Sequence, residues 1–182
     1  MDRNSKKVVI IGGGITSASY AQVLAHYTNI ESIVVLEAGS ELGGINTHSH
    51  NNSQTLHTGD IETNYSEEKA ADVKRATDLL VTYMEKNAPQ AYTVGQKMIL
   101  AVGTAEVAEL SYRFEKIKHL YPGLRPIGRG EIMQLEPHVI IDRDPSEPVL
   151  ALVNHGHTVD FQAVAKSFIP NTPMLCIGPT LC

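Results

Sequence analysis

The sequence of 182 residues contains no tryptophan and only two cysteines, Cys176 and Cys182, both close to its C-terminal end. Two cysteines are too few for a disulfide framework or a four-cysteine zinc site, and we expect no bound metal. No apolar run approaches the eighteen or so residues of a membrane span, and the first residues do not form a signal peptide. We therefore expect a soluble protein of a reducing compartment.

Positive charge is also scarce in this chain. Lysine and arginine total 15 against 20 aspartates and glutamates, which gives a net charge of −5. A nucleic-acid-binding protein normally presents a basic face, so we expect no nucleic-acid partner. Hydrophobic residues make up 42% and charged residues 19%, a composition typical of a globular chain with a core. The length accommodates one domain or two.

β-Branched residues dominate two short runs, 8–11 and 33–36, and residues 15–26 between them predict a helix. Such runs are typical of parallel strands that are buried on both faces. A strand, a glycine turn, a helix and a second strand within about 30 residues correspond to one βαβ unit. The N-terminal part of the chain therefore predicts an α/β fold.

The turn after the first run matches the dinucleotide fingerprint G-x-G-x-x-G/A over residues 12–17, with Ser17 in the third glycine position. In this pattern Gly12 permits the tight turn, Gly14 lets the backbone approach a pyrophosphate, and a small third residue lets helix and strand pack. Glu37 ends the second run, where a carboxylate would bind ribose hydroxyls. The alternative is a glycine-rich turn of an unrelated α/β fold, with Glu37 as a surface carboxylate.

The remaining sequence predicts further elements after a long segment, 39–65, that lacks apolar periodicity; loops of this length are usually functional or disordered. Helix caps and apolar spacing predict a helix capped by Ser66 and stopped by Asn87 and Pro89, strand structure over 91–102, a helix capped by Thr104 and running to Tyr121, a helical turn over 131–135, a strand over 149–153, and a helix after Asp160 that runs to Phe168.

Two segments resemble known flavoproteins. Residues 37–44 resemble the continuation found in the glutathione-reductase and D-amino-acid-oxidase superfamily, and residues 51–65, Asn-Asn-Ser-Gln-Thr-Leu-His-Thr-Gly through Glu-Thr-Asn-Tyr, resemble malate:quinone oxidoreductases. Residues 96–98, 135–137 and 156–160 agree with that family. The resemblance covers about residues 7–169.

The resemblance implies FAD as cofactor and the oxidation of (S)-malate to oxaloacetate in the tricarboxylic acid cycle, with a membrane quinone as electron acceptor. It implies a cytoplasmic protein that associates peripherally with the inner face of the cytoplasmic membrane. His57 is the candidate general base, since a neutral histidine suits that task; the alternative is a loop histidine that bonds to backbone. The predicted cofactor-binding residues are Gly12, Gly13, Gly14, Ile15, Ser17, Glu37, Ala38, Gly44, Ser53, Gln54 and Thr55.

The expected fold is a Rossmann-like FAD-binding βαβ unit followed by an interleaved α+β substrate-domain segment, and we expect it to be incomplete. The predicted domains are the first part of the FAD-binding domain (1–65), a substrate-domain segment (66–153), a return to the FAD-binding domain (154–169) and an atypical tail (170–182). The uncharged, proline-interrupted tail suggests a frame change or an artificial gene end.

Two alternatives to malate oxidation stay open. One is a related flavoenzyme that acts on another hydroxy acid or on an amine. The other is a truncated product without catalytic activity, and we expect no malate oxidation by the 182-residue chain alone.

Overall fold

The computed structural model describes residues 6–169, so the expected tail at 170–182 and both cysteines lie outside the described residues. The described residues form two compact units. The first contains 6–54, 82–93 and 158–169, and the second contains 55–81 and 94–157. This division falls after Gln54 rather than after residue 65, and it adds residues 82–93 to the first unit.

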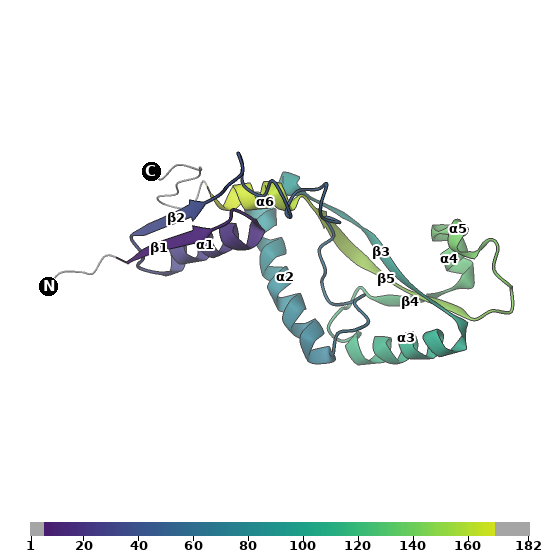
Figure 1. Cartoon of the computed structure of the whole chain (residues 1–182). Coiled ribbons are helices and arrows are strands. Elements are labelled where there is room, and N and C mark those ends of the chain that lie inside the picture. The colour runs from purple at the N-terminus through teal and green to yellow at the C-terminus, as the bar shows by residue number, and fades with distance from the viewer. Residues whose placement is uncertain (1–5, 170–182) are drawn as a thin grey trace. The chain divides into compact units, whose positions relative to one another are not determined.

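The first unit is built on the predicted βαβ arrangement (Figure 1). Strand β1 (Lys7–Ile11), helix α1 (Ile15–Tyr27) and strand β2 (Ser32–Leu36) follow one another along the chain. The two strands pair in parallel, with Val8 opposite Ile33 and Ile10 opposite Val35. Helix α6 (Phe161–Phe168) returns to pack against α1. The α/β class and the parallel βαβ unit are thus confirmed.

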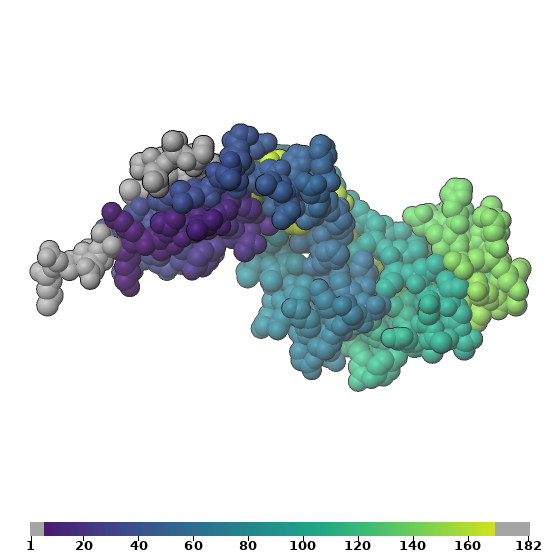
Figure 2. Space-filling model, in the orientation of Figure 1, coloured from purple at the N-terminus to yellow at the C-terminus, as the bar shows by residue number. Residues whose placement is uncertain are grey.

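Strand β1 is buried on one face only, as an incomplete sheet implies. Side chains alternate across a strand, and Val8 and Ile10 pack on the core of Ala21, Leu24, Ile33, Val35 and Leu42. Val9 and Ile11 lie on the other face and are 59% and 85% exposed. The N-terminal segment, purple in Figure 2, accordingly lies on the visible surface of this unit. Within the described residues the sheet has only two strands, and one face of β1 is uncovered.

The second unit combines helices with a three-stranded sheet of order β3-β5-β4. Strands β4 and β5 pair antiparallel, with Arg125 opposite Val153. Two cores stabilise the unit, one around Leu110, Ile117 and Leu152 and one around Ile127 and Ile132. The elements of this unit are α2 (Glu67–Asn87), β3 (Tyr92–Val102), α3 (Gly103–Ile117), β4 (Arg125–Gly128), α4 (Arg129–Leu135), α5 (Pro137–Ile140) and β5 (Val149–Val159). Of these, α2, β3 and β5 also contribute residues to the first unit, which contains the 3₁₀ turn η1 (Pro89–Ala91).

Two of the three predicted helix caps are confirmed. The Ser66 hydroxyl accepts the N–H of Lys69 at 3.2 Å, and the Asp160 carboxylate accepts the N–H of Ala163 at 2.9 Å. Thr104 is not a cap, because α3 already begins at Gly103. There the carboxylate of Glu106 accepts the N–H of Val102 at 2.9 Å and satisfies the backbone at the start of the helix.

The ends of two elements and the presence of one strand also differ from the prediction. Helix α3 ends at Ile117 rather than at Tyr121, and β5 continues to Val159 rather than stopping at Val153. Strand β4 was not predicted; it contains Pro126, which disfavours strand assignment from sequence and is tolerated at sheet edges. As predicted, the segment 39–65 contains none of the helices and strands named above.

Candidate functional site

The glycine turn between β1 and α1 forms a cradle at the N-terminus of the helix. Gly12 has φ of +91°, a conformation that favours glycine, and its N–H donates to the carbonyl of Leu36 at 2.8 Å. Gly14 is the N-cap of α1, and the first helical turn carries no acidic side chain. A cavity of about 200 Å³ opens here, lined by Gly12, Gly13, Gly14, Glu37, Gly43, Gly44, Ile45, Asn46 and Thr47. Free helix N–H groups and the helix dipole suit such a cavity to a phosphate group.

Glu37 joins the turn to the loop that follows β2. One carboxylate oxygen accepts the N–H of Gly39 at 2.7 Å and the other accepts the N–H of Gly13 at 2.6 Å. These backbone donors, Gly39 first and Gly13 second, hold the pKa of Glu37 below its ordinary value. The carboxylate therefore stays ionised, and its oxygens keep lone pairs for further donors such as ribose hydroxyls.

Gly13 lies in a tightly packed position, which the fingerprint spacing did not reveal. A Cβ at this position would lie 2.5 Å from Cδ2 of Leu42 and 2.9 Å from Oε2 of Glu37. The carbonyl of Gly13 also accepts the N–H of Gly43 at 2.9 Å. The loop that carries Gly43 thus packs directly on the glycine turn, and a side chain at Gly13 would force the side chains of Leu42 and Glu37 to shift.

Thr47 is a site residue that sequence reasoning missed. It is buried, and its hydroxyl accepts the N–H of Ile15 at 3.1 Å, so it supplies one of the partners that the start of α1 requires. Thr47 lies 32 residues after Ile15. No local motif marks such a distant cap, and only the folded loop brings it to the helix.

The other predicted cofactor contacts occupy different environments. Gln54 is buried with φ of +58°, and its side chain donates to the carbonyl of Thr47 at 3.4 Å and accepts the N–H of Phe161 at 3.0 Å. Its amide therefore connects the loop to the start of α6 within the first unit. The rest are Ser17, half-buried on α1; Ala38, Gly44 and Ser53, all exposed; and Thr55, half-buried at the start of the second unit.

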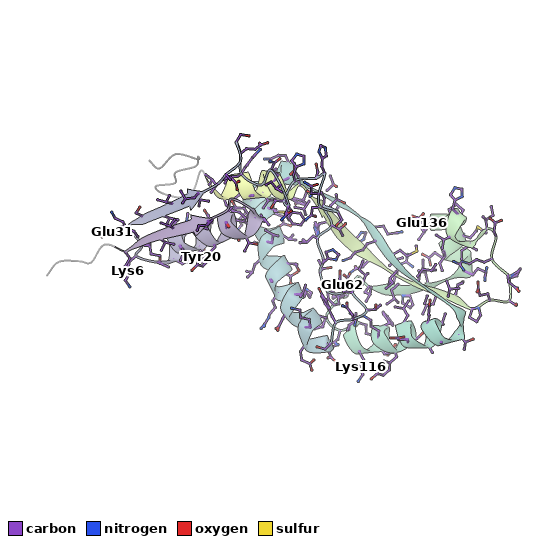
Figure 3. The ribbon with its side chains drawn as sticks, in the orientation of Figure 1. Lys6, Tyr20, Glu31, Glu62, Lys116 and Glu136 are labelled. Carbon is purple, nitrogen blue, oxygen red and sulfur yellow. The ribbon has the colours of Figure 1, made fainter. Side chains whose placement is uncertain are left out.

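His57, the candidate base, belongs to the second unit and pairs with a carboxylate. Its side chain is 60% exposed, and Nδ1 lies 2.7 Å from Oε1 of Glu62, which is 11% exposed. The other oxygen of Glu62 accepts the N–H of Gly59 at 2.8 Å. Glu62 lies on the segment between β2 and α2 (Figure 3). The alternative of a loop histidine bonded to backbone does not describe this contact.

A buried ionic cluster is centred on Asp60, two residues before Glu62 in the chain. The Asp60 carboxylate is completely buried and accepts hydrogen bonds from Lys97, from the Thr58 hydroxyl at 2.7 Å and from Asn154 at 2.6 Å. Burial raises the pKa of Asp60, but the hydrogen bonds and the charge of Lys97 outweigh burial and hold it below its ordinary value. The pair is therefore ionised and ties the loop to strands β3 and β5.

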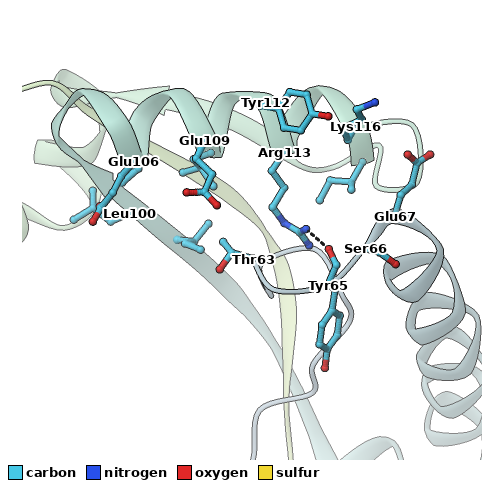
Figure 4. A pocket seen from close by; sticks show the side chains of 14 residues that line it. Thr63, Tyr65, Ser66, Glu67, Leu100, Glu106, Glu109, Tyr112, Arg113 and Lys116 are labelled. Carbon is cyan, nitrogen blue, oxygen red and sulfur yellow. Dashed lines mark hydrogen bonds between the residues drawn. The ribbon is translucent and has the colours of Figure 1, made fainter.

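Two more side chains hold the same loop from α3 and the segment after it. Arg113 donates to the carbonyl of Tyr65 at 2.7 Å (Figure 4) and to the carbonyl of Gly59 at 3.1 Å. The Tyr121 hydroxyl lies 2.8 Å from the carbonyl of Thr58. Burial and nearby negative charge raise the pKa of Tyr121, so the hydroxyl keeps the proton that it donates.

A second cavity, of about 550 Å³, lies in the second unit beside α3 (Figure 4). Its wall mixes charges of both signs with apolar side chains, and includes Glu106, Glu109, Arg113 and Lys116. None of the residues predicted from the sequence as site residues lines it. Although Arg113 lines this cavity, its guanidinium points towards the carbonyl of Tyr65 and binds the loop that carries His57.

Residues 6–169 contain neither a candidate membrane-spanning helix nor a candidate metal-binding cluster. No helix in that range is long and apolar enough to cross a membrane. No group of three histidine, cysteine, aspartate or glutamate residues in that range is arranged to hold a metal ion.

The fold and the cradle define a flavin-dependent oxidoreductase. The family model described as FAD dependent oxidoreductase (DAO) matches residues 7–169, and the chain belongs to this family. Solved structures share the fold: glycine oxidase from Geobacillus kaustophilus has a TM-score of 0.66 at 15% identity, covering 94% of this chain and 45% of that one. L-proline dehydrogenase from P. horikoshii has a TM-score of 0.65 at 21% identity, covering 95% and 44%.

Curated relatives are more similar in sequence. A probable malate:quinone oxidoreductase from Campylobacter jejuni is 38% identical over 179 residues, which cover 93% of this chain and 40% of the relative. The malate:quinone oxidoreductase of Helicobacter pylori strain 26695 is 30% identical over 168 residues, covering 88% and 37%. The chain therefore spans about two fifths of the length of the curated relatives that it matches.

The cradle fits the cofactor that the family description names. Its wall at Gly12 is open, since a Cβ there would meet no atom within 4 Å, and the helix N-terminus beside it carries no competing acid in its first turn. These features suit the diphosphate of FAD, with Glu37 placed at the end of β2 for the ribose.

Proposed function

We propose that the protein oxidises (S)-malate to oxaloacetate and reduces a membrane quinone, with FAD as cofactor. The observation that carries this proposal is the 38% identity, over 93% of this chain, to a relative that bears the name of that activity. The solved structures of the same fold, at 21% identity or less, support the oxidoreductase class without indicating a substrate.

The chemistry assigns separate tasks to the two units. FAD, when bound, supplies the acceptor for the hydride that leaves the hydroxyl carbon of malate. In the first unit, the backbone of Gly12–Gly14 would hold the diphosphate and Glu37 the ribose. In the second unit, His57 would remove the hydroxyl proton, so that the C–O bond becomes a carbonyl as the hydride departs. The remaining predicted contacts, at Ile15, Ser17, Ala38, Gly44, Ser53, Gln54 and Thr55, stay predictions.

A quinone acceptor implies a place of action as well as a reaction. Because such quinones dissolve in the bilayer, we propose that the protein acts at the inner face of the cytoplasmic membrane as a peripheral protein.

The test joins residues 1–169 of this chain to the remaining part of the Campylobacter jejuni relative, since this chain spans only 40% of that protein. FAD content is measured from A450 after desalting, and turnover from malate-dependent reduction of a quinone analogue. The unmodified relative is the positive control. We expect a yellow fusion that turns over malate and that loses turnover, but not FAD, on His57→Gln.

Three results would overturn parts of the proposal. A fusion that retains FAD but oxidises glycine, proline or glycerol phosphate instead of malate would assign the chain to another substrate class. A fusion without FAD would remove the cofactor role of residues 12–14 and 37. Full turnover by the His57→Gln variant would remove His57 from the reaction.

A further inference from the structure

The contact between His57 and Glu62 has the arrangement of a histidine held by a carboxylate. Nδ1 of His57 lies 2.7 Å from one oxygen of Glu62, and the second oxygen accepts the N–H of Gly59 at 2.8 Å. Glu62 is therefore anchored at both oxygens. Its side chain is 11% exposed, whereas that of His57 is 60% exposed. A largely buried carboxylate therefore binds Nδ1 of an accessible imidazole.

We propose that Glu62 is the positioning residue for His57 and fixes the ring in the tautomer that can act as a base on malate. The inference rests on the proposed function for its catalytic part. The orientation of the ring rests on the contacts in this chain alone.

The chemistry follows from the donor and acceptor inventory of the two side chains. An ionised carboxylate only accepts hydrogen bonds, so the ring nitrogen that faces it must carry a proton. In neutral His57 the proton is then on Nδ1, and Nε2 keeps a free lone pair. Among the hydrogen bonds found within residues 6–169, none engages Nε2 of His57. As the imidazole takes the malate proton on Nε2 and becomes cationic, the negative charge of Glu62 stabilises it.

The loop that carries both residues is held in place from several elements. Arg113 of α3 binds the carbonyls of Gly59 and Tyr65, which stand on either side of Glu62 in the chain. Tyr121 binds the carbonyl of Thr58, next to His57. Asp60, between the two members of the pair, is tied to β3 through Lys97. Such support is what a precise catalytic geometry requires.

The second unit contains a matched pair that lacks these features. Nε2 of His119 lies 3.4 Å from Oε1 of Glu67, and their side chains are 57% and 44% exposed. An exposed pair at this distance contributes little. Glu67→Gln is therefore the control for Glu62→Gln.

The first measurement uses the 182-residue chain with ¹⁵N-labelled histidine at alkaline pH, where histidine is neutral. The ¹⁵N resonances of the ring report which nitrogen carries the proton. We expect the Nδ1–H tautomer to dominate at His57 in the wild type and in Glu67→Gln, and to lose its dominance in Glu62→Ala and Glu62→Gln. A dominant Nε2–H form in the wild type, or unchanged tautomers in both Glu62 variants, would overturn the positioning role.

The second measurement uses the fusion with the Campylobacter jejuni relative. We expect Glu62→Gln to lower kcat for malate by at least about tenfold, with KM and FAD content unchanged, as when a histidine loses its orienting carboxylate. In the His57→Gln background the same change should have no further effect, because Glu62 acts through His57. Full kcat in Glu62→Gln, or additive effects of the two changes, would refute the inference.

The two measurements separate this inference from the proposed function. A fusion that is inactive on malate while His57 shows the expected tautomers would refute the function and leave the orientation of His57 by Glu62 intact. A Glu62→Gln fusion that oxidises malate at full rate would refute the role of Glu62 in the reaction and leave the proposed function intact.

Discussion

Replacing Asp60 with alanine tests the ionic cluster that supports the His57 loop. Asp60 is completely buried, and Lys97 beside it is 11% exposed. Removing one partner of a buried pair leaves the other charge uncompensated and costs about 3–5 kcal/mol. The variant also loses the hydrogen bonds from Thr58 and Asn154. Because a whole domain is stable by only about 5–15 kcal/mol, we expect a large decrease in the free energy of unfolding.

The measurement is urea unfolding followed by far-UV circular dichroism. Asp78→Asn is the control, because it breaks the i,i+4 pair between Lys74 and an Asp78 side chain that is 61% exposed, and such pairs contribute about 0.3–0.5 kcal/mol. The double variant Asp60→Ala with Lys97→Met removes both buried charges and should lose less stability than the sum of the losses in the two single variants.

Two results would refute this reasoning. One is a loss in Asp60→Ala no larger than that in Asp78→Asn. The other is full additivity when Lys97→Met is combined with Asp60→Ala, since two residues that interact directly should show a coupling energy. Either result would mean that the loop keeps its stability without the buried charge pair.

Three further predictions concern the first unit. Gly13→Ala should cost about 1–3 kcal/mol by overpacking and reduce FAD retention, whereas Gly95→Ala on β3, outside the cradle and with no atom within 4 Å of the added Cβ, should do neither; equal A450 values for the two variants would contradict the clash. The pKa of Glu37 is lowered in the folded state, so its contribution to stability is present above the ordinary pKa of 4.5 and is lost as the pH falls through the lowered pKa. The melting temperature of Glu37→Gln should therefore decline less in acid than that of the wild type. Parallel curves of melting temperature against pH would contradict this prediction. Replacing Val9 and Ile11, 59% and 85% exposed, by threonine should reduce aggregation in light scattering without lowering the melting temperature, and unchanged scattering would show that this face does not drive association.

The sequence by itself determined the local features. β-Branched runs, a glycine turn and helical spacing predicted β1, α1 and β2, because each depends on residues that are adjacent or a few positions apart. Ser66 and Asp160 were predictable as caps for the same reason, since a cap binds an N–H only two or three residues away. The dinucleotide fingerprint and Glu37 likewise follow one another within a single βαβ unit.

Only the tertiary structure decided the contacts between distant segments. The Thr47 hydroxyl that meets the start of α1, the Leu42 side chain that excludes a side chain at Gly13, and the Asp60–Lys97 pair join residues about 30 to 40 positions apart. The apolar run 8–11 predicted a strand in an incomplete sheet, and the structure decided which face is covered: Val8 and Ile10 pack on the core, and Val9 and Ile11 are exposed. Glu62 stands five residues from His57, yet no regular spacing brings them together. An irregular loop does so, and its path is set by Arg113 and Tyr121, which bind its backbone, and by Lys97 of β3, which binds its Asp60 side chain.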